Sequence, residues 1–475
     1  MDWDVLNRAK AKPVDFSNLA KAWAKSYNCY IPRAGRGSRH ASAAKGLRLK
    51  IADQWFRDIL GLLYQRRTAT RGEIIHSTGL NPACVSLTIQ HLLKSGTIQC
   101  VGERRSTGGR KREVLKLNPE AGYFVVVDLE GTRVRVGLAD FLGNIRYRWE
   151  EEIDLRQQYD VRRVLKGVEM IRRSLEGPAR RRLIAAGVSY TGLMDQQGRV
   201  TAVNLGWKDY PLRQSIEDSL GMPVFYGNDG HCKILAERWG GVAENCPNCV
   251  YVLAGVGIGI GCFVDGHLLE GHDGMAGEFG HLTMDHSAGD RCNCGKTGCL
   301  EAIVSSPNIV RQYLELSGRP AEDPRGHPVT EVFAMAREGD SDALAVMDRA
   351  GRALGLALSH LVNILNPQLI VLGGDLIHGH DLLLGVIREE LARHCAPKLA
   401  DHLILRVSSL GHDGGLKGAA ALAFLNSSQD RALLRRMTGP APPEDSPGEG
   451  RTKEPLTVKL KIGGLRRKKK GLITS

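Results

Sequence analysis

The stretch GEFGHLTMDHSAGDRCNCGKTGCLE, residues 277–301, combines the histidine of a GEFGH motif with three cysteines in CxCx4C spacing on a glycine-rich segment. One imidazole and three thiolates make four nitrogen and sulfur ligands, the number that a closed tetrahedral zinc site takes. Two alternatives remain open from the residues alone: a disulfide among the cysteines, or His286 as the nitrogen ligand. The candidate ligands are His281, Cys292, Cys294 and Cys299.

Length and composition set the broad class of the protein. With 475 residues the chain is too long for a single ordinary core, so two or three domains are expected. It shows no apolar run of about 18 residues and no signal-peptide pattern at its start, which predicts a cytoplasmic protein without a membrane partner. In that compartment the 11 cysteines are expected as thiols or metal ligands.

Charge is distributed unevenly along the chain. Residues 1–118 hold 22 Lys and Arg against 8 Asp and Glu, and residues 429–475 hold 12 against 5. Because the whole chain carries a net charge of +13, the segment 119–428 is left with a net charge of −8. Basic ends around an acidic centre favour a polyanion as the partner of the ends.

The N-terminal quarter divides into an arm and a small helical unit. Residues 1–50 are rich in Ala, Lys, Arg and Ser, and a flexible basic arm is expected there. Within 51–118 the first helix follows from apolar residues at helical spacing, and Thr70 begins a capping box that opens the second. Asn81 is the expected N-cap of a third helix, which Gly96 ends. Two short strands around a loop with five Lys and Arg residues complete the unit.

Three helices followed by a basic-tipped hairpin predict a winged helix-turn-helix domain that binds double-stranded DNA, with a dimerisation module as the alternative. In this docking mode the third helix enters the major groove, and the hairpin tip contacts phosphates or the minor groove. Phosphate contacts supply affinity, whereas base contacts supply sequence choice. The predicted contacts are Asn81, Ser86 and Gln90 on the third helix, and Arg110, Lys111 and Arg112 at the hairpin tip.

From Tyr123 the pattern changes to apolar strands that end in Gly or Asp before a helix or hairpin. This alternation predicts an α/β domain over 119–427, with its site at the strand ends. Residues 428–475 are polar and Pro-rich and contain the basic run LRRKKKG, so a disordered basic tail is expected there.

The motifs GEFGH at 277–281 and CNCGKTGCLE at 292–301 resemble the signature of the ROK family, named for repressors, open reading frames and kinases. The resemblance covers 51–427, because the helical unit with its GGRKR wing tip looks like the one that precedes the domain in the family's repressor branch. It implies a two-lobed actin-like fold of the sugar-kinase type and a homodimer or homotetramer. It also implies a structural Zn2+ ion at His281 and the three cysteines.

The same resemblance implies a sugar pocket. Carboxylate, amide and imidazole groups suit the ring hydroxyls of a sugar, because they offer acceptors and donors in several directions. In the family's kinases an Asp acts as the general base toward the attacking hydroxyl, and Asp229 takes that position in this chain. The implied sugar-binding residues are Asn204, Asn228, Asp229, Glu278, His281 and Glu301.

The phosphate side of the expected cleft departs from the kinase pattern. Relatives that use ATP carry D-x-G-G-T, whereas this chain reads Asp128-Leu-Glu-Gly-Thr, so Glu130 brings a negative charge to the place of a polyanion. Like charges at about 4 Å and an effective dielectric near 20 repel by roughly 4 kcal/mol. A second loop has Val256 in place of a hydroxyl residue. The residues retained at the nucleotide positions are Asp128, Gly131, Thr132, Gly255, Gly257, Gly373 and Gly374.

These features predict a sugar-responsive DNA-binding transcriptional regulator of carbohydrate-metabolism genes, with repression as the expected direction. Its expected partners are a double-stranded DNA operator and a small sugar or sugar-phosphate effector. ATP and Mg2+ are not expected as cofactors, because two phosphate loops are degenerate. The alternative is an ATP-dependent hexose or amino-sugar kinase with an appended DNA-binding domain.

Overall fold

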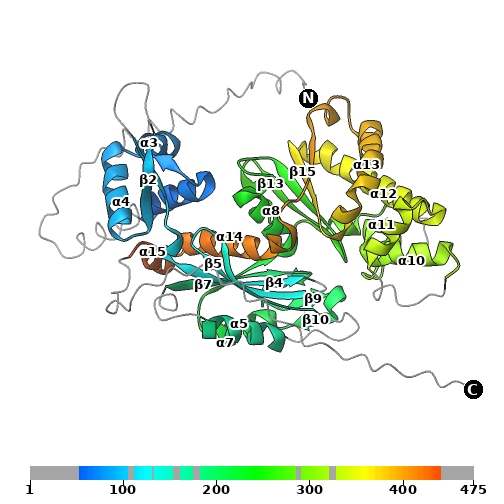
Figure 1. The fold of residues 1–475 in the computed structure, drawn as a ribbon, viewed down its shortest axis with the longest axis horizontal. Helices are drawn as coiled ribbons and strands as arrows, with labels where there is room; N and C mark the ends of the chain where they lie inside the picture. Colours follow the sequence, from blue (N-terminus) through cyan, green and yellow to red (C-terminus); the bar gives the residue numbers. More distant parts are fainter. Residues whose placement is uncertain are drawn as a thin grey trace, which may run out of the picture.

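The computed structural model shows an N-terminal unit followed by two lobes, each built on a five-stranded sheet (Figure 1). The predicted arm 1–50 lies outside the described residues, and so do Arg110 and Lys111 at the hairpin tip and the chain beyond residue 439. The described residues are 53–104, 112–130, 133–152, 161–174, 182–284, 290–319 and 328–439.

The N-terminal unit, residues 53–117, contains three helices and a hairpin, as the sequence predicts. Thr70 accepts the N–H of Glu73 while the Glu73 carboxylate accepts the N–H of Thr70, which completes the expected capping box. Asn81 caps the third helix by accepting the N–H of Ala83 at 2.8 Å. After the helical residues 53–66 the elements are β1 (Ala69–Thr70), α3 (Arg71–Thr78), α4 (Pro82–Lys94), β2 (Ile98–Arg104) and β3 (Arg112–Leu117).

The two lobes repeat one topology. In each sheet three antiparallel strands are joined by two parallel ones, which gives the orders β6-β5-β4-β7-β11 and β14-β13-β12-β15-β16. The first lobe contains β4 (Tyr123–Glu130), β5 (Arg133–Asp140), β6 (Ile145–Glu152), β7 (Leu183–Tyr190) and β11 (Val224–Asn228). The second contains β12 (Cys249–Ala254), β13 (Ile258–Val264), β14 (His267–Leu268), β15 (Leu369–Gly373) and β16 (Ile404–Val407).

Helices cover the faces of both sheets. On one face of the first sheet lie α5 (Arg162–Ser174) and α7 (Leu212–Leu220), while α8 (Asp229–Gly240) and α14 (Gly414–Gln429) share a core with the other face and with the second sheet (Figure 1). Within the described ranges, none of the helices has the length and apolarity needed to cross a membrane. The second lobe is covered by α9 (Leu300–Val304), α10 (Ser306–Leu316), α11 (Val329–Arg337), α12 (Ser341–Leu365) and α13 (His380–His394).

A further small sheet extends the first lobe beside the cleft. It consists of β8 (Leu193–Met194), β9 (Val200–Ala202) and β10 (Trp207–Tyr210), paired in antiparallel fashion. Buried residues of these strands join the core that α5 and α7 form with the first sheet. The small sheet therefore belongs to the first lobe.

Helix α14 approaches its neighbours closely because it is rich in small residues. A methyl group added at Gly418 would overlap the carbonyl of Cys232 in α8, and one at Gly187 of β7 would overlap the carbonyl of Ala419. Glycine at these two positions therefore lets α14 pack directly on α8 and on the first sheet.

The segment expected as a disordered tail, residues 428–475, contains a helix in its described part. The chain continues into α15 (Arg431–Thr438), which is capped by Asp430 through the N–H groups of Ala432 and Leu433. Three apolar residues of this short amphipathic helix are buried in the core that also contains the N-terminal unit. They were missed because the polar, Pro-rich segment that follows dominates the composition; they are Leu433, Leu434 and Met437.

Candidate functional site

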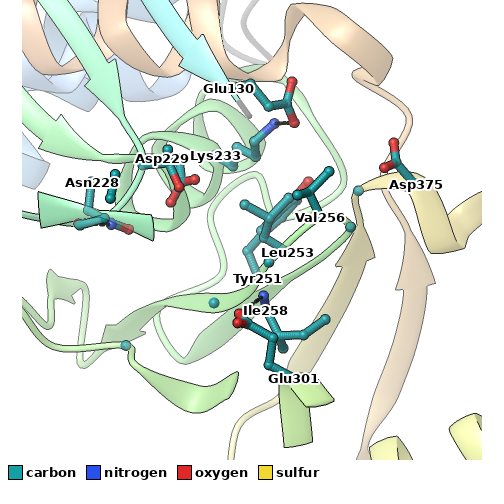
Figure 2. A pocket seen from close by; sticks show the side chains of 18 of the residues that line it. Glu130, Asn228, Asp229, Lys233, Tyr251, Leu253, Val256, Ile258, Glu301 and Asp375 are labelled. Carbon is teal, nitrogen blue, oxygen red and sulfur yellow. Dashed lines mark hydrogen bonds and ion pairs between the residues drawn. The ribbon is translucent and has the colours of Figure 1, made fainter. Parts of the chain in front are cut away.

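A cavity of about 520 Å³ opens between the two lobes at the carboxyl ends of several strands (Figure 2). Glu130 ends β4, Asn228 ends β11, and Gly255 follows β12. The turn after β7 contributes Thr191 and Gly192. The strand ends of both lobes therefore supply one shared site, as the sequence predicts.

Five of the six expected sugar-binding residues line this cavity together. The Asn228 side chain donates to the carbonyl of Gly192 at 3.2 Å and accepts the N–H of Gly230 at 2.9 Å, so it also caps α8. The side chain of Asn204 is not among the described ones. The five that meet are Asn228, Asp229, Glu278, His281 and Glu301.

Asp229 is a buried carboxylate in the first turn of α8. Burial raises its pKa to about 7, against the opposing effect of the Lys233 ammonium. Burial also raises the pKa of Glu278. A carboxyl that titrates near neutrality can accept a proton from a hydroxyl group, which is the property that a general base needs.

Glu301 has a structural contact besides its place in the cavity. It lies in the first turn of α9, and its Oε2 accepts the N–H of Ile258 at the start of β13 at 3.0 Å. Glu278 stands directly before the short helix η4 (Phe279–His281) and is more exposed. Of these two carboxylates, Glu278 is therefore the freer one to meet a ligand.

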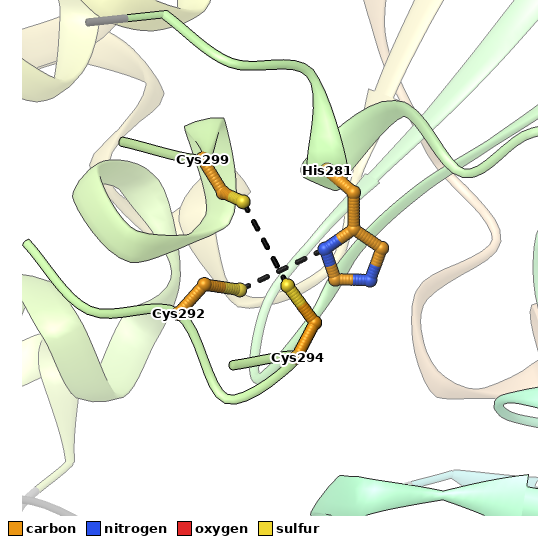
Figure 3. A group of neighbouring side chains, drawn as sticks. All are labelled: His281, Cys292, Cys294 and Cys299. Carbon is orange, nitrogen blue, oxygen red and sulfur yellow. Dashed lines mark hydrogen bonds between the residues drawn. The ribbon is translucent and has the colours of Figure 1, made fainter. Parts of the chain in front are cut away.

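The histidine and the three cysteines of the 277–301 stretch converge on one point (Figure 3). Their four ligand atoms all lie within 4.8 Å of one another. The Cys292 Sγ lies 3.7 Å from His281 Nδ1, and the Cys294 Sγ lies 3.8 Å from the Cys299 Sγ. Zinc–sulfur bonds of about 2.3 Å at tetrahedral angles place two sulfurs about 3.8 Å apart. The residues fit a tetrahedral metal ion, and the three thiols are free rather than disulfide-bonded.

The imidazole of His281 connects the cysteine cluster with the cavity. Its Nδ1 faces Cys292, and its Nε2 lies 3.7 Å from the Glu278 carboxylate on the cavity side. Since a ring nitrogen that holds a metal fixes the direction of the other, a metal ion here would orient Nε2. The alternative ligand His286 lies outside the described residues.

The opposite half of the cavity is lined by three charged side chains, Glu130, Arg135 and Lys233, which form a network with the buried Asp128. Arg135 donates through Nη1 to Asp128 at 2.9 Å and to Glu130 at 2.7 Å, and Lys233 Nζ lies 3.0 Å from Glu130. The Arg135 and Lys233 side chains are only 2% and 5% exposed. Burial alone would raise the pKa of Glu130, but Lys233 and Arg135 lower it to about 2.

This network alters the argument by which a degenerate phosphate site is predicted from Glu130. The repulsion expected from Glu130 assumed an uncompensated carboxylate, whereas two cations neutralise it. Glu130, Arg135 and Lys233 instead line the cavity at the end of β4 with polar groups that already bond to one another or to Asp128. Gly131 and Thr132, which follow Glu130, lie outside the described residues.

The other retained nucleotide-motif glycines have separate roles. Gly255 and Gly257 line the cavity on either side of Val256. A methyl group at Gly373 would overlap the Tyr251 hydroxyl, and Gly374 has a left-handed φ of 86°. Packing and backbone conformation therefore require the Gly373–Gly374 pair whether or not a nucleotide binds.

Arg135 and Lys233 are functional-site residues that the motif comparison did not identify. The available signal was a charged residue inside an otherwise apolar run, in RVRVGL of β5 and in CKILA of α8. Charged side chains are almost never fully buried unless they are paired, so an acidic partner is expected for each of these two residues. The partners come from distant parts of the chain, which a local pattern does not reveal.

The predicted DNA-contacting residues that the structure describes are on the surface. Asn81, Ser86 and Gln90 are exposed on or beside α4, and Arg112 is exposed at the start of β3. The oxygen of Asn81 is engaged in the cap of α4, which leaves its amide group for other contacts. Leu87 is 65% exposed between Ser86 and Gln90, so this face of α4 also presents an apolar group.

Fold and cleft define a two-lobed protein of the sugar-kinase type that carries an additional N-terminal helical unit. The pattern of the ROK family matches residues 124–425, and the chain belongs to this family. It is 34% identical over 313 residues to a glucokinase of Halalkalibacterium halodurans, covering 63% of this chain and 94% of that protein.

Two regulators match a larger part of the chain. A xylose repressor of Bacillus spizizenii is 27% identical over 385 residues, covering 79% of this chain and 98% of the repressor. A crystal structure of a ROK family transcriptional regulator, described as a homolog of the E. coli MLC protein, superposes with a TM-score of 0.66 at 25% identity. That match covers 82% of this chain and 99% of the regulator.

Proposed function

We propose that this protein is a sugar-responsive transcriptional repressor in which the N-terminal unit binds operator DNA and the cleft binds a sugar without transforming it. The observation that carries this proposal is the contrast inside the cleft. One half is lined by the polar side chains that suit a sugar, and the other is lined by acidic and basic side chains that are paired with one another. The greater coverage by a xylose repressor than by a glucokinase supports the same conclusion.

The N-terminal unit has the properties of a winged helix-turn-helix DNA-binding domain. Its third helix, α4, presents Ser86 and Gln90 to solvent and has no acidic residue in its sequence. The hairpin β2–β3 would place Arg110, Lys111 and Arg112 near the backbone phosphates. A homodimer or homotetramer would match two such units to the half-sites of a palindromic operator.

The sugar half of the cleft offers acceptors on several sides. The carboxylates of Asp229, Glu278 and Glu301 would accept hydrogen bonds from ring hydroxyls, and the Asn228 amide and His281 Nε2 add further polar contacts. A site built this way rejects a sugar that lacks one of these hydroxyls, because a buried polar group then stays unpaired. The proposed effector is a small sugar or sugar phosphate.

The cysteine cluster would hold a structural zinc ion through His281, Cys292, Cys294 and Cys299. All four positions of a tetrahedron are filled by protein atoms, so the ion would supply a cross-link and no reactive water. The cross-link would fix the segment between Glu278 and Glu301. This arrangement explains why a segment so rich in glycine can present two carboxylates to one cavity.

The function is tested by fluorescence anisotropy of a labelled DNA fragment selected from a random library with the purified protein. D-xylose, D-glucose, N-acetyl-D-glucosamine and the 6-phosphates of the last two form the effector panel. One of them is expected to weaken DNA affinity by about tenfold or more, the range of a coupling free energy near 1.4 kcal/mol. Glu278→Ala should lose this response and keep DNA binding. A selected DNA whose affinity no sugar changes would reject the proposal.

The zinc proposal has its own measurement. Elemental analysis of the native protein should give one zinc per chain, and Cys294→Ser should lose it. Cys100→Ser is the matched control, because Cys100 is also exposed but lies in β2, away from the cluster. Native protein without zinc, or a Cys294→Ser variant that keeps it, would contradict the assignment.

One observation favours a second candidate, an ATP-dependent sugar kinase. Asp229 stands at the family's general-base position with a pKa of about 7, and the glucokinase relative is 34% identical. Purified protein with MgATP and D-glucose would then release ADP in proportion to the sugar. Turnover that Asp229→Asn abolishes would establish the kinase. We expect no ADP release above a sugar-free blank.

A further inference from the structure

Two helices run from the cleft to the N-terminal unit. Helix α8 has Asp229 and Lys233 at the cavity and Trp239 in its last turn, and its 12 residues span about 18 Å at 1.5 Å per residue. Helix α14 begins beside Gly411 and His412 of the cavity lining and ends at Gln429. The close packing of Gly418 against α8 joins the two helices into one layer.

The far end of α8 is held by an arginine of the N-terminal unit. Arg67, directly after the helical residues 53–66, donates to the main-chain carbonyls of Leu142 and Trp239. Its guanidinium lies over the Trp239 ring at 5.4 Å, and the indole N–H donates to the same Leu142 carbonyl at 2.9 Å. Three parts of the chain therefore meet at the Arg67 side chain.

Aromatic packing reinforces this junction. Tyr64, on the last turn of the first helix, stacks on Phe424 of α14 with ring centroids 3.9 Å apart, and Phe424 meets the Trp239 ring edge-on. All three rings are buried in the core that the N-terminal unit shares with the lobes. At the end of α14, Arg57 donates to the carbonyls of Ser428 and Gln429.

Arg67 adopts a backbone conformation that non-glycine residues rarely take. Its φ is 63°, in the left-handed region, which is unfavourable for a residue with a side chain. Such a conformation persists when the surrounding contacts hold it, and here these are the two carbonyls of the first lobe and α8. The turn between the first helix and β1 is thus set by contacts to the ligand-binding part of the protein.

We propose that Arg67 is the positioning residue through which a sugar in the cleft sets the orientation of the N-terminal unit. This inference rests on the proposed function. A shift of the first turn of α8 on sugar binding would move Trp239 and Leu142 relative to each other, and Arg67 would carry that shift into the turn before α3. Half-sites about 34–36 Å apart tolerate little change in the placement of two such units.

The test compares Arg67→Met with Arg66→Met. Methionine keeps much of the apolar stem and removes the guanidinium, while Arg66 is exposed and gives the matched loss of one charge. In Arg67→Met the sugar-induced change in DNA affinity is expected to fall from about tenfold to under about twofold. Affinities for the sugar alone and for the DNA alone should stay within about threefold of wild type. Arg66→Met should keep the full response.

Hydrogen–deuterium exchange supplies a readout that a purely structural role would not move. In wild type, the sugar that stabilises the protein in a melting assay should change exchange at residues 228–239 and at 53–67. In Arg67→Met only the change at 228–239 should remain. Trp239→Phe, which keeps a ring and removes the indole N–H, should weaken the response in the same direction if Arg67→Met does not fold.

The outcomes separate this inference from the proposed function. A sugar that binds and alters DNA affinity equally in wild type and Arg67→Met overturns the role of Arg67 and leaves the repressor intact. Exchange changes confined to the cleft of wild type overturn it as well. A panel in which no sugar binds removes the proposed function, and the inference falls with it.

Discussion

The two halves of the cleft differ in whether their carboxylates form ion pairs with Lys or Arg. In the half with Asp229, Glu278 and Glu301, no Lys or Arg of the described residues forms an ion pair with these carboxylates, and His281 is the nearest basic group to Glu278. In the other half, Glu130 is paired with both Arg135 and Lys233. Within the described part of the chain, the first half therefore has carboxylates without a Lys or Arg ion pair, and in the second half the carboxylate charge is neutralised by cations of the same chain.

The pairing of the carboxylates indicates which half of the cleft can bind a ligand. A partly desolvated carboxylate without an ion pair is costly to the protein alone, although Lys233 partly offsets this cost at Asp229. Such a carboxylate is typical of a site where a ligand supplies hydrogen-bond donors. A carboxylate such as Glu130, whose oxygens already accept hydrogen bonds from two cations, has few lone pairs free to bind a ligand. Glycine motifs alone do not make this distinction, because Gly373 and Gly374 are required by packing in either case.

The largest effect is expected when the ion network is broken. Lys233→Met should lower the free energy of unfolding by about 3–5 kcal/mol, because Glu130 would remain near Asp128 with one cation fewer. Urea unfolding followed by circular dichroism measures the change. The double variant Glu130→Gln with Lys233→Met should recover about 2 kcal/mol or more, since the two side chains form one unit.

The exposed ion pair between Lys166 and Glu151 is the matched control for this experiment. Lys166 lies 3.2 Å from Glu151 and its side chain is 65% exposed. Lys166→Met should cost less than about 1 kcal/mol, as surface ion pairs do. If Lys233→Met lowered the free energy of unfolding as little as Lys166→Met, the ion network around Glu130 would not stabilise the fold as we infer.

Much of the fold could be predicted from local sequence. The Thr70–Glu73 capping box, the Asn81 cap and the apolar strands from Tyr123 onward depend on neighbouring residues, and the structure contains them. Helix α15 could not be predicted in the same way, because its three buried apolar residues pack in a core shared with the N-terminal unit and the first lobe, which are distant in the sequence.

The candidate site was predictable to the extent that it lies in compact motifs. GEFGH and CNCGKTGCLE placed Glu278, His281 and the cysteines together. The structure brings Glu278, His281 and Cys294 to the cavity, and the other two cysteines join His281 and Cys294 in one cluster. The ion network was not predictable, since Arg135 and Lys233 find their partner Glu130 only after β4, β5 and α8 pack. The repulsion assigned to Glu130 was wrong for the same reason.

The next largest expected effect is on the pH dependence of stability and concerns Asp229, in the half of the cleft whose carboxylates form no ion pair with Lys or Arg in the described ranges. Burial raises the pKa of Asp229 to about 7, so the native state binds this proton more tightly than the unfolded chain, where Asp titrates near 3.9. The resulting destabilisation grows as pH rises from about 4 to about 7 and then stays constant, at most about 4 kcal/mol. Asp229→Asn should therefore gain stability over wild type progressively from pH 5 to about pH 7, with little further gain up to pH 8.

Thermal melts of wild type and Asp229→Asn at four pH values across that interval provide the measurement. Aspartate and asparagine have nearly the same shape, so the pH-dependent part of the difference reports the ionisation of Asp229. A difference that is identical at pH 5 and pH 8 would show that Asp229 is ionised throughout, and that the sugar half is less desolvated than its burial indicates.

The smallest effect is expected for the sugar affinity of a Glu278 variant, which tests whether the carboxylates without a Lys or Arg ion pair bind a ligand. Glu278→Gln keeps the size of the side chain and removes its charge, so sugar affinity should fall about 10- to 100-fold, the equivalent of roughly 1.5–3 kcal/mol for hydrogen bonds to a charged group. Isothermal titration with the sugar that stabilises the protein gives the value. Glu270→Gln is the control, because Glu270 is exposed and does not line the cavity. Equal sugar affinity in the two variants would mean that Glu278 serves the His281 loop rather than the ligand, and the contrast between the halves would then rest on Asp229 alone.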